Sequence, residues 1–289
     1  MQIHFRPLQS GWFILVVLFL LAMTSQVLAQ PSAQQDKRTL LELLGTGTPQ
    51  PDPERSGPAT AVVVNGSAYL VDFGPGVVRR AASARIDKGI AALEPTNLRV
   101  VFLTHLHFDH CGGSVNWNKD KTGYELAFKN ANYWTNENHW EWATKPNLRE
   151  KASFLSENIL PIQESGQLNF IQNPEEFYVE KSELDFGIFF VDGHTEKMMI
   201  PHIQYQDKTI CFMADLLPTA GHLPLPYVMG YDTRPLLTMP EKSKFLNTAA
   251  EDNYYLFLEH DAHNEIITVE KTEKGVRLKD VFTVNQIFN

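Results

Sequence analysis

Three histidines and one aspartate lie within six consecutive positions, in the segment LTHLHFDH at residues 103–110. Residues i and i+2 of an extended segment point the same way, so His105 and His107 can face one metal ion. After the chain turns within FDHCGG, Asp109 and His110 can face a second position nearby. Imidazole and carboxylate ligands together suit zinc, with iron and manganese as alternatives.

A metal ion explains this cluster better than ordinary packing does. Without one, the cluster would hold several desolvated, mutually repelling groups. Structural zinc usually has four closed ligands, often cysteines, and the sequence has no cysteine pair at ligand spacing, which favours a catalytic site with an open position. His4, His139, His202 and His263 stand alone and are interpreted as ordinary core or surface residues. We expect substitution of His139 to change activity little.

Other strand-like apolar runs also end at residues that can bind a metal ion. LRVVFLT leads into the histidine cluster, and three further runs, GIFFVDGH, KTICFMAD and NYYLFLEHD, bring His194, Asp215 and His260 to strand ends. An α/β scaffold usually builds a site from polar groups at the carboxyl ends of its strands. We therefore expect these segments to meet at one site.

The remaining pattern predicts the layers around these strands. Asn65-Gly66 is a strong signal for a tight hairpin. Helical spacing runs through residues 136–158, and residues 234–251 are expected to form a helix with Pro240 as a break or first-turn residue. Strands that alternate with helices, with hairpins at the start of each half, predict two sheets packed face to face with helices outside.

The first 29 residues have the pattern of a secretory signal peptide. Arg6 precedes an apolar run at residues 12–23, and Val27 and Ala29 give the small-residue pattern of a cleavage site. The run is shorter than the roughly 20 residues that span a bilayer, and an uncleaved membrane anchor is the alternative. We expect an exported protein, periplasmic or secreted, with no stable membrane span after cleavage.

The composition limits the partners of the mature chain. Residues 30–37 are expected to be a polar leader, and residues 38–289 to form a single hydrolase domain. The formal net charge of −9 at pH 7, with no basic stripe, makes nucleic acid a poor partner, so we expect a small-molecule substrate. The two cysteines, Cys111 and Cys211, are expected to be buried thiols rather than a disulfide. Nothing in the sequence indicates an oligomeric state.

The segment THLHFDH resembles the HxHxDH signature of the metallo-β-lactamase superfamily. The other superfamily motifs follow in order, with Asp72 in LVDFG, His194 in DGHT, Asp215 in MAD and His260 in LEHD. The resemblance covers residues 38–289. It implies an α/β fold, a four-layer αβ/βα sandwich with a two-metal site between the sheets.

The resemblance also implies the role of each residue toward two zinc ions. One ion would be held by three histidines: His105, His107 and His194. The other would be held by Asp109, His110 and His260. Asp215 would bridge the two ions, and Asp72 would brace the ligand loop from outside.

Two branches of the superfamily are similar to different parts of the chain. LGTGTPQPDPERSGPA and LVDFGPG are similar to the opening of tRNase Z-like members, whereas THLHFDHCGG and FLEHDAH are more like the lactonase and organophosphate-hydrolase branch. The negative charge and the signal peptide argue against the tRNase Z branch. One β-lactamase subclass has a cysteine at the bridging position. The aspartate found here makes hydrolysis of β-lactams a less favoured interpretation.

The sequence therefore predicts an exported dinuclear zinc hydrolase in which a metal-bridging hydroxide attacks an ester, a lactone or a similar carbonyl substrate. Alternatives are a phosphodiesterase or tRNase Z-like enzyme, a β-lactam hydrolase, and a zinc-binding protein that keeps the fold without catalysis. Asp109 and Asp215 are the predicted catalytic residues, Asp109 because it can orient the nucleophile as well as bind metal.

Substrate contacts are predicted around the loop at residues 218–232, which is long and punctuated by proline and glycine. His222, Tyr227 and Tyr231 of this loop could donate hydrogen bonds to a substrate carbonyl, and a packed surface loop is the alternative. Phe108, between two ligands, is expected to wall the pocket, and Trp140 to pack in the core.

Overall fold

The computed structural model describes residues 39–47, 53–172 and 174–288, all of which belong to one compact unit. The predicted signal peptide and polar leader lie outside the described residues. Within the described ranges, no helix is both long enough and apolar enough to cross a membrane.

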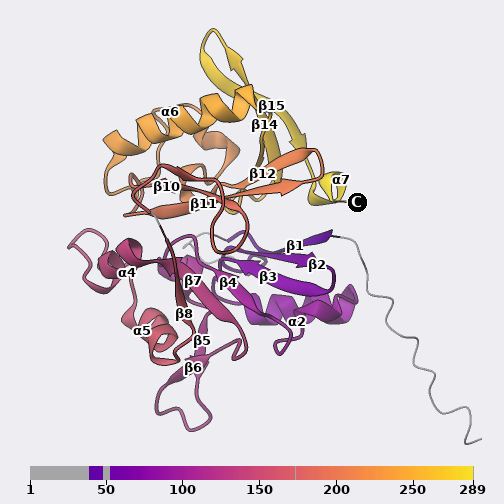
Figure 1. Ribbon diagram of the computed structural model, residues 1–289, viewed down its shortest axis with the longest axis vertical. Helices are drawn as coiled ribbons and strands as arrows, with labels where there is room; N and C mark the ends of the chain where they lie inside the picture. The colour runs from indigo at the N-terminus through magenta and orange to yellow at the C-terminus, as the bar shows by residue number, and fades with distance from the viewer. Residues whose placement is uncertain (1–38, 48–52, 173, 289) are drawn as a thin grey trace, which may run out of the picture. The chain divides into compact units, whose positions relative to one another are not determined.

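Two sheets face each other, and helices cover their outer faces (Figure 1). The strands of the first sheet, in spatial order, are β1 (Thr39–Gly45), β2 (Ala59–Val64), β3 (Ser67–Val71), β4 (Val100–Phe102), β7 (Asn132–Asn136) and β8 (Leu168–Ile171). The strands of the second sheet, in spatial order, are β15 (Gly275–Phe282), β14 (Ile266–Thr272), β13 (Tyr255–Phe257), β12 (Lys208–Phe212), β11 (Met198–Tyr205), β10 (Gly187–Val191) and β9 (Tyr178–Val179). A separate hairpin pairs β5 (Val115–Trp117) with β6 (Tyr124–Leu126).

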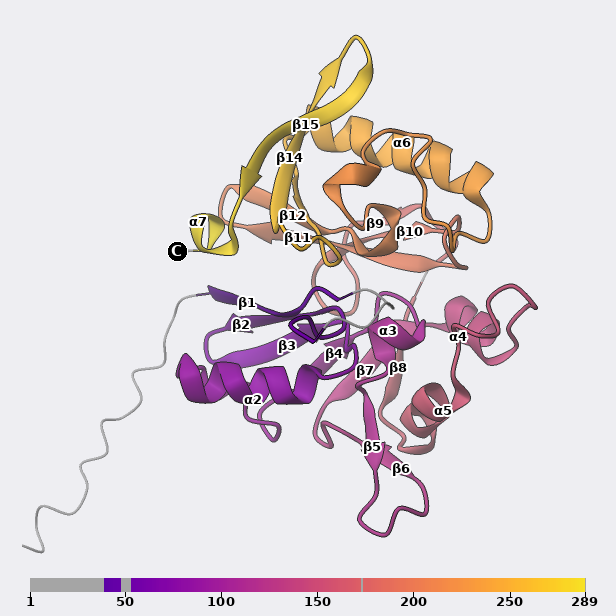
Figure 2. The same ribbon diagram turned by 180° about the vertical axis from the view of Figure 1, so that it is seen from behind.

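The helices complete the four layers. Seen from the opposite side, α6 lies outside the second sheet and α2 outside the first (Figure 2). The helices are α2 (Val77–Asp87), α3 (Phe108–Cys111), α4 (Glu137–Thr144), α5 (Ser156–Glu164), α6 (Pro235–Glu251) and α7 (Val284–Ile287). Short 3₁₀ turns are η1 (Ala91–Leu93), η2 (Ala214–Leu216) and η3 (Ala220–His222). This arrangement confirms the predicted sandwich.

Three apolar clusters hold the four layers together. One lies between the first sheet and its helices, one between the second sheet and α6, and one between the two sheets. Successive side chains of a strand point to opposite faces, so Phe189 packs toward α6 while Phe190 packs between the sheets. Burial on both faces explains why strands such as GIFFV are continuous apolar runs.

Strand direction places the candidate ligands at one edge of each sheet. The pairs β3–β4, β4–β7 and β7–β8 in the first sheet and β12–β13 in the second are parallel. Their carboxyl ends therefore meet, so Asp72 after β3 lies beside the histidine cluster after β4. In the second sheet, β10 runs in the same direction as β12, because each pairs antiparallel with β11. His194, Asp215 and His260 are consequently also gathered at one edge.

The predicted Asn65-Gly66 turn and the buried cysteines are both present. Asn65 and Gly66 have φ values of 50° and 77°, the left-handed pair that a two-residue hairpin turn requires. Cys111 and Cys211 are buried free thiols, as predicted.

The helix expected over residues 234–251 is present as α6, but two details of the helix predictions differ from the structure. The helical spacing over residues 136–158 belongs to two helices: α4 ends at Thr144, and α5 begins at Ser156. Pro146 disfavours helical conformation in the preceding residue, and Lys145 has φ −127° and ψ 57°. Pro240 lies inside α6, and the first-turn position is occupied by Pro235.

Candidate metal centre

The structure brings the seven predicted ligands together between the two sheets. His105 follows β4, His107 directly precedes α3, and α3 itself carries Asp109 and His110. His194 follows β10, Asp215 lies in η2 and His260 follows β13, and all seven residues are buried.

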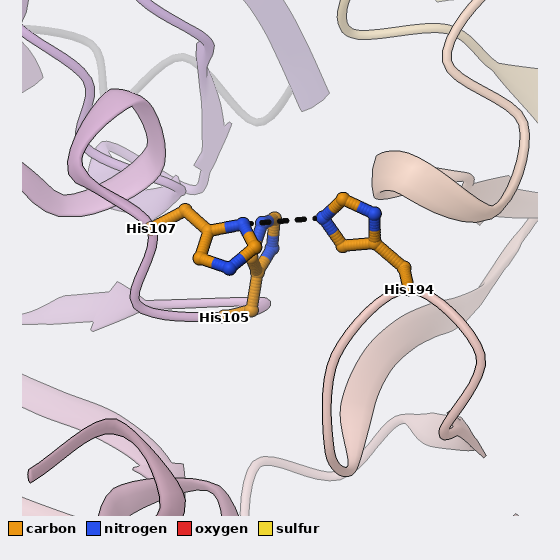
Figure 3. A group of neighbouring side chains, drawn as sticks. All are labelled: His105, His107 and His194. Carbon is orange, nitrogen blue, oxygen red and sulfur yellow. Dashed lines mark hydrogen bonds between the residues drawn. The ribbon is translucent and has the colours of Figure 1, made fainter. Parts of the chain in front are cut away.

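The first metal position is surrounded by three histidines whose ligand nitrogens all lie within 4.8 Å of one another. His105 and His107 approach from one loop, and His194 approaches from the opposite sheet (Figure 3). His194 Nε2 lies 3.2 Å from His107 Nδ1. His105 Nε2 is buried and has no hydrogen-bond partner within the described part of the chain.

The second metal position lies among Asp109, His110 and His260, whose ligand atoms also lie within 4.8 Å of one another. His110 Nε2 is 3.1 Å from His260 Nε2 and 3.8 Å from Asp109 Oδ2. The side chains of Asp109 and, at the first position, His107 are 10% and 7% exposed, against 4% or less for the other ligands. The centre therefore opens to solvent on the side of Asp109 and His107.

The Asp215 carboxylate lies between the two positions. Its Oδ2 is 3.2 Å from His194 Nε2 and 3.9 Å from His105 Nε2. Its Oδ1 is 2.9 Å from His260 Nε2 and 3.4 Å from His110 Nε2. One oxygen thus faces each group of histidines, which is the arrangement of a bridging ligand.

These distances fit divalent cations. Zinc–nitrogen bonds are about 2.0–2.1 Å long, which sets tetrahedral ligand atoms about 3.3 Å apart. The nitrogen pairs at 3.2 Å and 3.1 Å match that spacing. Without a cation, two buried imidazole lone pairs would face each other at this distance.

Every histidine ligand uses its outward nitrogen to donate a hydrogen bond to an oxygen, which leaves the inward nitrogen free to bind a metal. We call these oxygen-bearing residues the outer partners. His105 donates to Thr104 Oγ1 at 3.1 Å, His107 to Glu150 Oε1 at 3.3 Å, His194 to Asp232 Oδ1 at 2.9 Å, His110 to Asp72 Oδ2 at 2.7 Å, and His260 to the Gly47 carbonyl at 2.7 Å.

Asp72 holds the ligand loop as the resemblance implies. Its Oδ1 accepts the Thr104 backbone N–H at 2.7 Å, and its Oδ2 accepts the Thr104 hydroxyl at 2.8 Å. The residue has φ 59°, a left-handed conformation that aspartate tolerates and that often occurs at functional sites. The loop also passes close to its neighbour, because a Cβ on Gly113 would lie 2.3 Å from the Gly74 carbonyl oxygen.

Sequence reasoning missed the outer partners Glu150 and Asp232. Glu150 also accepts hydrogen bonds from Trp142 Nε1 at 2.6 Å and Asn147 Nδ2 at 2.7 Å. Asp232 accepts from the Thr238 hydroxyl at 2.8 Å. Both residues stand alone in loops, 43 and 38 positions from the histidines they contact, so no local pattern marks them.

Charge is unevenly distributed over the centre. Burial and the neighbouring imidazoles hold the pKa of His105 well below its usual value, and burial lowers the pKa of His107. At His110, burial is outweighed by Asp215, Asp72 and Asp109, which raise the pKa well above its usual value. Burial opposes ionisation of Asp215, but the surrounding histidines hold its pKa well below the usual range. Metal binding should therefore release a proton from the centre.

The predicted substrate contacts occupy different surroundings. Phe108 is partly buried, and His222 is half-buried with its Nδ1 2.8 Å from Thr219 Oγ1. Burial, followed by Lys242, lowers the pKa of His222. Tyr227 and Tyr231 are each 61% exposed. Trp140 is buried in the cluster behind the first sheet, as predicted.

One of the other histidines, His139, lies closer to the centre than its position in the sequence indicates. His139 is fully buried, as a core residue should be, but its ring accepts the Leu106 N–H at 2.8 Å. Leu106 lies between two ligands, so His139 is next to the centre and is unsuitable as a remote control.

Comparisons with solved structures show the same fold. A dizinc quorum-quenching lactonase called AidC, determined with a product, aligns with a TM-score of 0.63 and 17% identity over 78% of this chain and 79% of that one. A probable metal-dependent hydrolase from Staphylococcus aureus aligns with a TM-score of 0.60 and 17% identity over 85% of this chain and 95% of that one.

Sequence comparison adds a local match and a family. Ribonuclease Z from Mycobacterium marinum (strain ATCC BAA-535 / M) is 50% identical over 70 residues, which are 24% of this chain and 23% of that protein. Ribonuclease Z from Mycobacterium avium (strain 104) matches at the same identity over 24% and 22%. The match thus spans about a quarter of these relatives. Residues 52–260 match the profile described as the metallo-beta-lactamase superfamily. The chain belongs to the metallo-β-lactamase superfamily.

Proposed function

We propose that the protein is an exported dinuclear zinc hydrolase that cleaves the acyl–oxygen bond of esters or lactones. The position of Asp215 carries this proposal, because one carboxylate oxygen faces each group of histidine ligands. A carboxylate shared in this way fixes the distance between two cations and balances part of their charge.

Two bound zinc ions would supply Lewis acidity and make hydroxide available at neutral pH, so that no serine or cysteine nucleophile is required. The protein supplies position. Asp109 lies at the open side of the centre, where its carboxylate can accept a hydrogen bond from the attacking water and orient it. The outer partners keep each imidazole in the tautomer that binds metal.

We propose that His222 assists the leaving group or the carbonyl oxygen. It is close enough to the centre for the charges of Asp215 and His260 to act on it, and its lowered pKa keeps it neutral at pH 7. When the Thr219 hydroxyl donates to Nδ1, the proton is on Nε2 and can be donated to substrate oxygen.

The arginine and lysine side chains near the centre favour a neutral substrate over a phosphodiester. Arg55 donates to the carbonyls of Thr46 and His260, and Arg149 donates to the Gly230 carbonyl. Lys242 donates to three carbonyls of the loop after Asp215. These cations are turned toward backbone oxygen, whereas a phosphodiester substrate needs them turned toward its phosphates.

Phosphodiester hydrolysis is the second candidate, and the local identity to Ribonuclease Z favours it. The two candidates share the metal centre and differ in the substrate.

The N-terminal pattern supports the proposal of export, and mass spectrometry of the native protein should find its N-terminus at Gln30. An intact Met1 in a cytoplasmic fraction would contradict export.

A substrate panel tests the proposal. Zinc-loaded protein lacking residues 1–29 is assayed with lactones, aryl esters, a β-lactam, a phosphotriester, a phosphodiester and a precursor tRNA. We expect the highest kcat/KM on a lactone or ester. Preference for the phosphodiester or the tRNA would support the second candidate, and no turnover of any substrate by protein with two bound zinc ions would contradict a hydrolase.

A further inference from the structure

His139 connects the two loops that carry all three ligands of the first metal position. Its Nε2 accepts the backbone N–H of Leu106 at 2.8 Å, and its Nδ1–H donates to the Glu196 carbonyl at 2.5 Å. Leu106 lies between His105 and His107, and Glu196 lies two residues after His194. A single buried ring therefore spans the gap between the two sheets beside the metal centre.

We propose that His139 is a positioning residue that sets the distance between these two loops and thereby the geometry of the first metal position. The inference rests on the proposed dinuclear centre and does not depend on which substrate is hydrolysed.

The ring is itself held in place from both sides. The His139 backbone N–H donates to Asn136 Oδ1 at 2.9 Å, which caps the start of α4. Asn136 Nδ2 donates to the Lys197 carbonyl at 2.8 Å, next to the Glu196 carbonyl that His139 binds. The first turn of α4 is thus attached twice to the loop after His194, and the ring reaches from this anchor to Leu106.

A neutral imidazole suits this position because it offers one acceptor and one donor on opposite sides of a rigid ring. Burial lowers the pKa of His139 to about 4, so the ring stays neutral at physiological pH. A protonated ring would carry two donors and could not accept the Leu106 N–H. Removing the ring would leave the buried Leu106 N–H and the partly buried Glu196 carbonyl without these partners.

The ligands of the second metal position are attached independently. The Phe73 N–H donates to the His110 carbonyl at 2.7 Å, and the Phe108 N–H donates to the Ser153 carbonyl at 2.9 Å, so α3 is held at both ends. His260 is held by the Gly47 carbonyl. Loss of the His139 bridge should therefore affect the first position selectively.

The test measures metal affinity at each position by competition with a chelator, together with the absorption spectrum of the cobalt-substituted protein. In His139→Phe, the ring volume is kept but both hydrogen bonds are lost. We expect the dissociation constant of one metal ion to rise about 10–100-fold, as for other supporting residues of metal ligands, while the other stays unchanged. In the cobalt-substituted protein, only the absorption of the ion at the first position should change. In His139→Gln, the amide can accept and donate, and part of the affinity should return.

His202→Phe is the matched control. His202 is also a buried histidine, but it packs against Tyr178, Phe189 and Tyr254 in the second half of the fold. We expect this variant to lose stability and to keep both metal affinities. If His139→Phe does not fold, His139→Asn replaces it, because the shorter amide reaches one loop but not both.

The inference is overturned if a folded His139→Phe or His139→Asn variant binds both ions as the wild type does, or if it weakens both equally. Wild-type protein that binds fewer than two ions would overturn the dinuclear centre as well. Two tightly bound ions without hydrolysis of any panel substrate would overturn the proposed function and leave this test intact.

Discussion

The two metal positions are built from the same kinds of ligand but are supported differently. At the first position, His107 and His194 donate to carboxylates, Glu150 and Asp232, that stand in separate loops. At the second position, His110 donates to Asp72, directly after β3, and His260 donates to a backbone carbonyl directly after β1. Two of the three histidines at the first position thus depend on loops, whereas both histidines at the second depend on strand ends.

The loops that support the first position are also joined to each other. Arg149, next to Glu150, donates to the Gly230 carbonyl at 2.6 Å, two residues before Asp232. A carboxylate behind a histidine raises the basicity of the ligand and fixes its ring. The first position can therefore be altered by substitutions far from the metal ligands in the sequence, whereas the second is tied to the core of the first sheet.

Asp215→Asn should have the largest effect, because this residue belongs to both positions. The substitution keeps the shape of the side chain but removes a negative charge and a strong ligand. We expect kcat to fall by more than the roughly 10–100-fold typical of losing an outer partner, together with weaker binding of one ion. Kinetics, zinc content and far-UV circular dichroism measure these effects. A folded variant with wild-type turnover would show that Asp215 is not a bridge.

Glu150→Gln and Asp72→Asn should separate the two positions. Each replaces an outer carboxylate by an amide, so each should lower the affinity for one metal ion about 10–100-fold. Glu150→Gln should affect the first position. Asp72→Asn should affect the second position most, and the first position less, because Asp72 holds His110 directly and His105 only through Thr104. The difference is read from cobalt spectra during titration. If the same cobalt absorption band were lost first in both variants, the two metal positions would not be supported by different residues.

The pH dependence of stability should reveal the buried neutral ring of His139. Burial lowers its folded-state pKa from 6.5 to about 4, so below pH 6.5 the unfolded chain takes up a proton that the folded chain does not. The free energy of unfolding therefore decreases as the pH falls from 6.5 toward about 4. From pH 7 to pH 5, metal-free wild type should lose about 2 kcal/mol more than His139→Gln. Urea unfolding at both pH values measures this, and equal losses would show that the ring is protonated in the folded state.

The smallest effect is expected at the rim of the first position. Tyr231 is 61% exposed and precedes the outer partner Asp232. Tyr231→Ala should raise KM by less than about tenfold, with stability changed by under about 0.5 kcal/mol. Tyr69→Ala, on β3, is the control and should leave KM unchanged. An unchanged KM in Tyr231→Ala would remove this residue from the substrate contacts.

The ligand set could be predicted because its residues lie at the ends of apolar strands and at short spacing. His105, His107 and His110 are visible as a local pattern, and parallel strands then bring Asp215 and His260 to the same edge. The sandwich followed from the same alternation of strands and helices.

The supporting residues could not be predicted, because tertiary packing chooses them. Glu150, Asp232 and His139 have no local pattern, and their partners lie 43, 38 and 33 positions away. The sequence also does not predict β11, although it lies between β10 and β12. Pro201 is inside that strand, where a proline normally argues against a central strand.

Zinc-edge anomalous diffraction from crystals of the zinc-loaded protein would show directly whether Asp215 lies between two metal ions. We predict two peaks about 3.5–4 Å apart, one on each side of the Asp215 carboxylate. The first should lie among His105, His107 and His194, and the second among Asp109, His110 and His260. A single peak, or two peaks that do not share Asp215, would contradict the bridged two-metal centre.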